Sequence, residues 1–172
     1  LRNGIECIRH LSEAELLENG ESPTKMRHRN YVPAASILEK FEHFDADFFG
    51  FSPKEAAILD PQHRHFLEVA WEAMEDAGLV LDLEKGSNIG VFAGASHTDY
   101  QAIQGSPWDR SAVSPHTATG SAHSIAANRV SYSFNLLGPS MSVDTACSSA
   151  LTAVRATFTG AYRPKASVIG LT

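Results

Sequence analysis

The sequence predicts a layered α/β fold, and three observations support that prediction. Residues 89–92 have the composition of a short buried strand, and residues 119–135 are rich in the small side chains of a closely packed helix. Residues 141–143 form a second strand pattern, followed at once by a helical segment over 147–158. Strands and helices that alternate along a chain are typical of helices packed on the faces of a sheet.

Length and composition favour one globular domain. The chain has 172 residues, of which 43% are apolar and 20% charged, so it has enough apolar material for a core. A net charge of −6 argues against a nucleic-acid partner, and no apolar run approaches the roughly 18 residues that span a bilayer. The first residues lack both an initiator Met and the apolar core of a signal peptide. We therefore expect a fragment of a longer protein, with no membrane partner.

The two cysteines, Cys7 and Cys147, stand far apart in the sequence. Without a secretory signal we expect a cytoplasmic chain with reduced thiols, and therefore no disulfide between them. No Cys-x-x-Cys pair indicates zinc, and His63 and His65 do not share a helix face. We expect no metal site and no bound cofactor.

The first half of the chain carries clear helix signals. Ser12 and Glu15 have the spacing of a capping box, and residues 19–30 have the composition of a surface loop. Asp60 can cap a helix that begins at Pro61 and ends before Gly78. Apolar residues recur along this helix with the 3.6-residue period, at Phe66, Ala70, Ala73 and Ala77.

The segment between residues 41 and 53 holds five phenylalanines, at positions 41, 44, 48, 49 and 51. We expect them to pack a loop onto the core, the alternative being a partner or dimer surface. Residues 96–118 lack periodicity and form a long excursion, which favours a functional loop. Beyond Gly160 and Pro164 the chain leaves its last helix, and a further strand is expected at Val168 and Ile169.

Cys147 lies where the strand over 141–143 meets the helix over 147–158. Unpaired backbone N–H groups and the positive end of the helix dipole favour the thiolate at such a place. A sharp strand-to-helix turn also exposes a nucleophile, and Ala146, Ser148 and Ser149 are small enough to admit a substrate. The alternative for a lone cysteine is a small buried apolar side chain.

Four ordered blocks resemble one family. The stretch "GPSMSVDTACSSALTAV" is similar to the active-site signature of β-ketoacyl synthases, in particular the ketosynthase domains of modular polyketide synthases. The blocks "FDADFFGFSPKEAAILDPQHRHFLEVAWEAMEDAGL", "NIGVFAGAS" and "TATGSAHSIAANRVSYSFNLLGPS" resemble the segments that precede it, in the same order. The resemblance runs from about residue 4 to about residue 155 and implies a thiolase-like layered fold, of which this chain holds part of the N-terminal half.

The resemblance also implies an activity. Cys147 would accept an acyl group from the phosphopantetheine arm of an acyl carrier protein, and its own backbone N–H would be one oxyanion donor. A malonyl-type extender on a carrier protein would then lose carbon dioxide and attack the thioester, in a decarboxylative Claisen condensation. The implied partners are the acyl carrier protein, the other domains of a polyketide synthase and, for a complete domain, a second copy.

The sequence departs from the family in two places. The family's two catalytic histidines follow its cysteine and adjoin glycines, whereas all eight histidines here precede Cys147 and none adjoins a glycine. Residues 156–172 do not continue the family pattern. We interpret residues 1–172 as a partial ketosynthase domain that is inactive in condensation by itself. The alternatives are a non-catalytic scaffold or dimerisation piece and, less favoured, a cysteine hydrolase, for which no pattern is visible.

Overall fold

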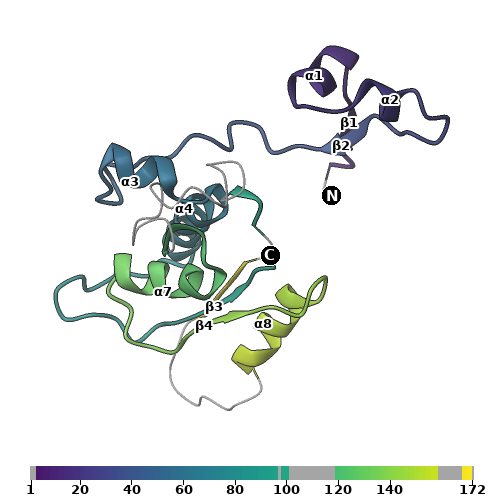
Figure 1. Ribbon diagram of the computed structural model, residues 1–172. Helices are drawn as coiled ribbons and strands as arrows, with labels where there is room; N and C mark the ends of the chain where they lie inside the picture. Colours follow the sequence, from purple (N-terminus) through teal and green to yellow (C-terminus); the bar gives the residue numbers. More distant parts are fainter. Residues whose placement is uncertain (1–2, 97, 101–118, 159–167, 172) are drawn as a thin grey trace. The chain divides into compact units, whose positions relative to one another are not determined.

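The computed structural model describes residues 3–96, 98–100, 119–158 and 168–171 (Figure 1). These fall into two units, Leu1–Phe41 and Glu42–Thr172, each with its own internal packing. In the described ranges, no helix is both long and apolar enough to cross a membrane.

The first unit is a small hairpin with two short helices. Strand β1 (Ile8–His10) pairs antiparallel with β2 (Ala34–Ser36), and between them lie α1 (Glu13–Glu18) and α2 (Pro23–Met26). Helix α2 was not predicted, since residues 19–30 were expected to form a loop. Pro23 at the first helical position favours this single turn, and the side chain of Ser22 at the N-cap makes no capping hydrogen bond.

The capping box at Ser12 is confirmed. The backbone N–H of Ser12 donates to the Glu15 carboxylate at 2.8 Å, and the N–H of Glu15 donates to the Ser12 hydroxyl at 3.2 Å. The hydrogen bond from the Ser12 backbone, with a further one from Arg9, lowers the pKa of Glu15 to about 2. The box fixes the chain direction where α1 begins.

The second unit has the predicted layers. Strands β4, β3 and β5 form a parallel sheet in that order, with Val91 opposite Ser140 and Ile169. Helix α7 packs on β3 and β4 and also against α4, while α8 packs on all three strands from the other face (Figure 1). The bounds are α3 Pro53–Ile58, α4 Pro61–Asp76, β3 Gly90–Gly94, α7 His123–Ser133, β4 Ser140–Val143, α8 Ser149–Phe158 and β5 Val168–Leu171.

Helix α4 begins and ends as predicted. The Asp60 carboxylate accepts a hydrogen bond from the backbone N–H of Gln62 at 2.8 Å, which satisfies one donor of the first turn. Gly78 follows the last turn with φ of 65°, the left-handed conformation that glycine adopts without a side-chain penalty. The strand predicted at Val168 and Ile169 is confirmed as β5.

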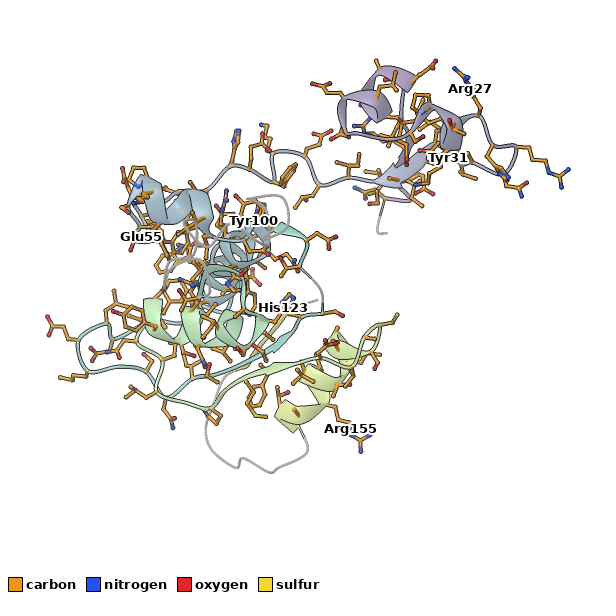
Figure 2. The ribbon with its side chains drawn as sticks, viewed as in Figure 1. Arg27, Tyr31, Glu55, Tyr100, His123 and Arg155 are labelled. Atoms are coloured by element: carbon orange, nitrogen blue, oxygen red, sulfur yellow. The ribbon has the colours of Figure 1, made fainter. Side chains whose placement is uncertain are left out.

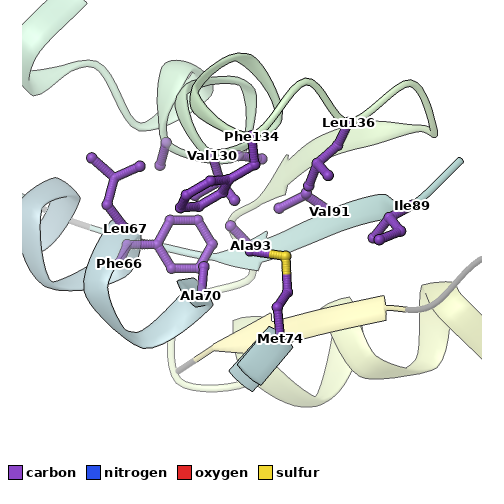
Figure 3. Close-up of a cluster of buried hydrophobic side chains, with 12 residues drawn as sticks. Phe66, Leu67, Ala70, Met74, Ile89, Val91, Ala93, Val130, Phe134 and Leu136 are labelled. Carbon is purple, nitrogen blue, oxygen red and sulfur yellow. The ribbon is translucent and has the colours of Figure 1, made fainter. Parts of the chain in front are cut away.

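The core lies between α4, α7 and one face of β3. Val91 and Ala93 point into it, whereas Phe92, between them in the strand, is buried outside this cluster (Figure 3). Because successive side chains of a strand point to opposite faces of the sheet, Phe92 lies on the face that α8 covers. The members of the cluster are Phe66, Leu67, Ala70, Met74, Ile89, Val91, Ala93, Ala126, Ala127, Val130, Phe134 and Leu136.

Three of the five phenylalanines between residues 41 and 53 pack on this core, as expected, whereas Phe41 is exposed and belongs to the first unit. Phe44, Phe49 and Phe51 are partly buried against it, and the ring of Phe49 lies 6.1 Å from that of Phe134. Phe48 is exposed but contacts Trp71 edge to face, with ring centroids 5.1 Å apart. The excursion predicted over 96–118 lies mostly outside the described residues.

The connection between α3 and α4 is held by a buried arginine. Arg64 donates to the carbonyl of Leu59 at 2.8 Å and to that of Glu42 at 3.2 Å. It also donates to the hydroxyl of Tyr100 at 2.9 Å, which ties residues 98–100 to this connection. Hydrogen bonds to main-chain carbonyls satisfy the buried guanidinium.

His63 on α4 makes unfolding sensitive to pH. Its side chain is only 2% exposed, and its ring nitrogens have no hydrogen-bond partner among the described residues. Burial, with smaller effects from Arg129 and His123, lowers the pKa of His63 from 6.5 to about 4, although Asp60 acts in the opposite direction. The folded chain therefore keeps this ring neutral where the unfolded chain protonates it.

We expect acid to destabilise the wild-type chain through this ring. Because the unfolded chain binds the proton at the higher pH, stability is complete above about pH 6.5 and falls as the pH drops toward 4. The loss is about 2 kcal/mol between about pH 7 and pH 5. Urea unfolding at both pH values measures the free energy of unfolding. A His63→Gln chain should lose correspondingly less of it between the two pH values than the wild-type chain. An equal pH dependence in both chains would contradict this assignment.

Candidate active site

Cys147 lies in the turn between β4 and α8, and its side chain is exposed. Helix α8 begins at Ser149, so the helix predicted from residue 147 starts two residues later than expected. The difference arises at Ala146, whose φ of 52° puts it in the left-handed region and turns the chain before the helix can form. Cys147 therefore precedes the first turn of the helix instead of lying within it.

Ser149 closes this turn with its side chain. Its hydroxyl accepts a hydrogen bond from the backbone N–H of Thr145 at 2.8 Å and donates one to the carbonyl of Ala146 at 2.7 Å. The backbone N–H of Ser149 donates to the same carbonyl at 3.0 Å. Ser149 is 5% exposed whereas Thr145 and Ala146 are exposed, so the hydroxyl bonds are partly buried.

A second, exposed set of hydroxyls surrounds the turn. Ser148 donates to the carbonyl of Thr145 at 2.8 Å, and Thr152 donates to the carbonyl of Ser148 at 2.9 Å. The carboxylate of Asp144 accepts from the N–H of Ala146 at 2.9 Å. The main chain around Cys147 is thus held from both sides by short polar side chains.

The start of α8 rests directly on the end of β3. A Cβ atom at Gly94 would lie 2.7 Å from the backbone nitrogen of Ala150. Any larger residue at this position would therefore force the strand and the helix apart. The N–H of Ala95 donates to the carbonyl of Val143 at 3.2 Å, so β3 and β4 end together. Only glycine allows this approach of strand to helix.

Cys147 therefore lies at the carboxyl edge of a parallel sheet. Helix α7 leads into β4 on one face of the sheet, and α8 leaves β4 on the other. In open α/β sheets, ligands bind beyond the carboxyl ends of the strands. The site lies between two neighbouring strands whose following helices pack on opposite faces of the sheet. The structure places the cysteine named from the sequence at such a point.

The hydrogen bonds that Ser149 makes in this turn were not predicted from the sequence, which indicated only that the residue is small. Its hydroxyl bonds depend on the left-handed Ala146, and nothing in the local composition predicts that conformation. The pair of serines after the cysteine was the one available signal, because serine and threonine hydroxyls commonly satisfy backbone groups at helix starts.

Both thiols are free in the structure, and Cys7 is also exposed. Within the ranges that the structure covers, no group of His, Cys, Asp and Glu could hold a metal ion. His123 is the first residue of α7 (Figure 2), and His63 lies on α4, so both come from helices on the face opposite α8. His97 and His116 lie outside the described residues.

Residues 1–160 match the N-terminal domain of the β-ketoacyl synthases. The chain belongs to the β-ketoacyl synthase family. Its relatives include the polyketide synthase GfsA of Streptomyces halstedii, 47% identical over 121 residues, which are 70% of this chain and 2% of that protein. The pikromycin polyketide synthase component PikAII of Streptomyces venezuelae is 44% identical over 126 residues, 73% of this chain and 3% of that protein.

Solved ketosynthases share the fold. Ketosynthase twelve of the bacillaene polyketide synthase of Bacillus amyloliquefaciens is 32% identical, with a TM-score of 0.72 over 88% of this chain and 26% of that one. The ketosynthase of module 1 of the bacillaene synthase of Bacillus amyloliquefaciens FZB42 matches with a TM-score of 0.68. This β-ketoacyl synthase chain has a mixed α/β fold that covers about a quarter of a ketosynthase structure.

Proposed function

We propose that Cys147 is the acyl-accepting nucleophile of a partial ketosynthase domain. The observation that carries this proposal is the exposed thiol in the turn between β4 and α8, in a chain of the β-ketoacyl synthase family. The sulfur attacks the carbonyl carbon of an acyl thioester, and the carrier thiol leaves as the new thioester forms. The backbone N–H of Cys147 is proposed as one donor to the transient oxyanion.

The proposed substrate is an acyl chain on the phosphopantetheine arm of an acyl carrier protein, with no resident cofactor. The proposed partners are that carrier protein, the other domains of a polyketide synthase and a second copy of the complete domain. The relatives named above are polyketide synthases, which supports this choice. Two free thiols support a reducing compartment, and we propose the cytoplasm.

Condensation requires more than this chain supplies. We propose that residues 1–172 are part of the domain, that residues 156–172 depart from its pattern, and that histidines of the enolate-stabilising motifs come from elsewhere. This is supported by the eight histidines of the chain, none of which adjoins a glycine. The isolated chain is therefore proposed to accept an acyl group without extending it.

Acylation can be compared at two cysteines of one molecule. The 172-residue chain is incubated with a hexanoyl thioester of N-acetylcysteamine, and peptide mass spectrometry follows Cys147 and Cys7. We expect Cys147 to be acylated at least about tenfold faster, because the fixed turn offers a backbone donor to the oxyanion. A malonyl thioester added afterwards should leave the mass of the hexanoyl adduct unchanged.

Cys7 corrects this comparison for the intrinsic reactivity of an exposed thiol. Equal acylation of both cysteines would remove the proposed function and would favour the scaffold alternative. An adduct enlarged by an extender unit would show instead that the chain condenses by itself.

A further inference from the structure

We infer that Ser149 is a positioning residue that sets the direction of the Cys147 backbone N–H. This inference rests on the proposed function, since it concerns the same oxyanion donor. Ser149 itself is directed at the main chain, because its hydroxyl is bonded to the Thr145 N–H and the Ala146 carbonyl. It therefore acts on the acyl group only through the peptide that follows Ala146.

The geometry of that peptide carries the inference. The carbonyl of Ala146 and the N–H of Cys147 belong to one planar unit, and no peptide bond in the described chain is cis. In a trans peptide the two groups point in opposite directions. Because the hydroxyl and the N–H of Ser149 both draw the Ala146 carbonyl toward the start of α8, the N–H of Cys147 points away from it.

The conformation of the turn shows why a side chain is needed. A left-handed backbone is unfavourable at a residue other than glycine, and Ala146 has φ of 52°. Ala146 carries no polar side chain that could offset this cost. The buried Ser149 hydroxyl bonds the N–H of Thr145, just before the strained position, and the carbonyl of Ala146 itself, and so stabilises the left-handed conformation.

Two reactions of the same sulfur distinguish positioning from general damage. Acylation by a thioester moves the carbonyl electron pair onto oxygen, so its rate depends on the direction of the N–H donor. Alkylation by iodoacetamide displaces iodide from a saturated carbon and develops no oxyanion. A misdirected N–H therefore slows acylation while alkylation continues.

The test uses the 172-residue chain with Ser149→Ala, and measures acylation by the hexanoyl thioester and alkylation by iodoacetamide at Cys147. We expect acylation to fall about tenfold or more and alkylation to change less than about twofold. Ser149→Thr keeps a hydroxyl and should retain most of the acylation rate. Thr157→Ala removes a hydroxyl that donates to the carbonyl of Val154, further along the same helix and away from the turn, and serves as the matched control.

The possible results are separable. Unchanged acylation in Ser149→Ala, an equal fall of both reactions, or an equal loss in the alanine and threonine variants overturns the inference. The proposed function has its own check in the wild-type chain, where Cys147 must be acylated faster than Cys7. If that check succeeds and the alanine variant behaves as wild type, only the role of Ser149 is wrong.

Discussion

Replacement of Cys147 by serine is expected to abolish acyl transfer to this turn. A serine hydroxyl is almost wholly protonated at neutral pH and needs an adjacent base to attack a thioester. The hydrogen bonds described for the turn come from the main chain and from the side chains of Asp144, Ser148, Ser149 and Thr152, so the substitution should leave the turn folded. Intact-protein mass spectrometry after incubation with the hexanoyl thioester measures the effect.

The matched control for this variant is Cys7→Ser, which removes the other exposed thiol. The Cys7→Ser chain should still gain one acyl group, whereas the Cys147→Ser chain should gain only the slow label at Cys7. Fast acylation that persists in the Cys147→Ser chain would place the nucleophile elsewhere.

Gly138→Ala is expected to cause the largest loss of stability among the predictions made for this chain. A Cβ atom at this position would lie 2.4 Å from the carbonyl oxygen of Ile89 and 2.6 Å from the backbone nitrogen of Gly90. Main-chain atoms in a sheet cannot move aside as a flexible side chain can, and the N–H of Gly138 also donates to that Ile89 carbonyl. Overpacking typically costs about 1–3 kcal/mol, and contacts with two fixed main-chain atoms place this substitution at about 3 kcal/mol, the upper end of that range.

Urea unfolding of the wild-type and Gly138→Ala chains measures this difference. Gly78→Ala is the useful comparison, because a Cβ there meets no atom within 4 Å and only the backbone angle is unfavourable. It should cost only about 1 kcal/mol. If Gly138→Ala were no more destabilising than Gly78→Ala, the close approach of residue 138 to β3 would be wrong.

The sequence predicted the elements better than their junctions. Helix α4 was recognisable from Asp60, Pro61 and Gly78 because caps are local, as was β3 from its apolar run. The start of α8 was placed two residues early because the left-handed Ala146 has no local signal. Alanine favours helices, and hydrogen bonds of the Asp144 and Ser149 side chains with the main chain of Ala146 stabilise its left-handed conformation instead.

At the candidate site too, local signals were readable from the sequence, whereas features that depend on tertiary contacts were not. Cys147 was identified from a motif, and its role stays a prediction; the structure shows that the thiol is exposed in the turn. The burial of His63 required tertiary structure, because the helix period alone does not show which polar residue is covered by α7. The sequence likewise did not show which rings of the phenylalanine-rich segment are packed and which are exposed, because that also depends on tertiary structure.

The contact at Gly94 has a consequence for how the turn between β4 and α8 is anchored. Strand β3 and helix α8 meet there main chain to main chain, so the start of α8 cannot move away from the sheet without breaking a contact between two backbones. The turn that carries Cys147 is therefore tied to the sheet on its helix side as well as on its strand side.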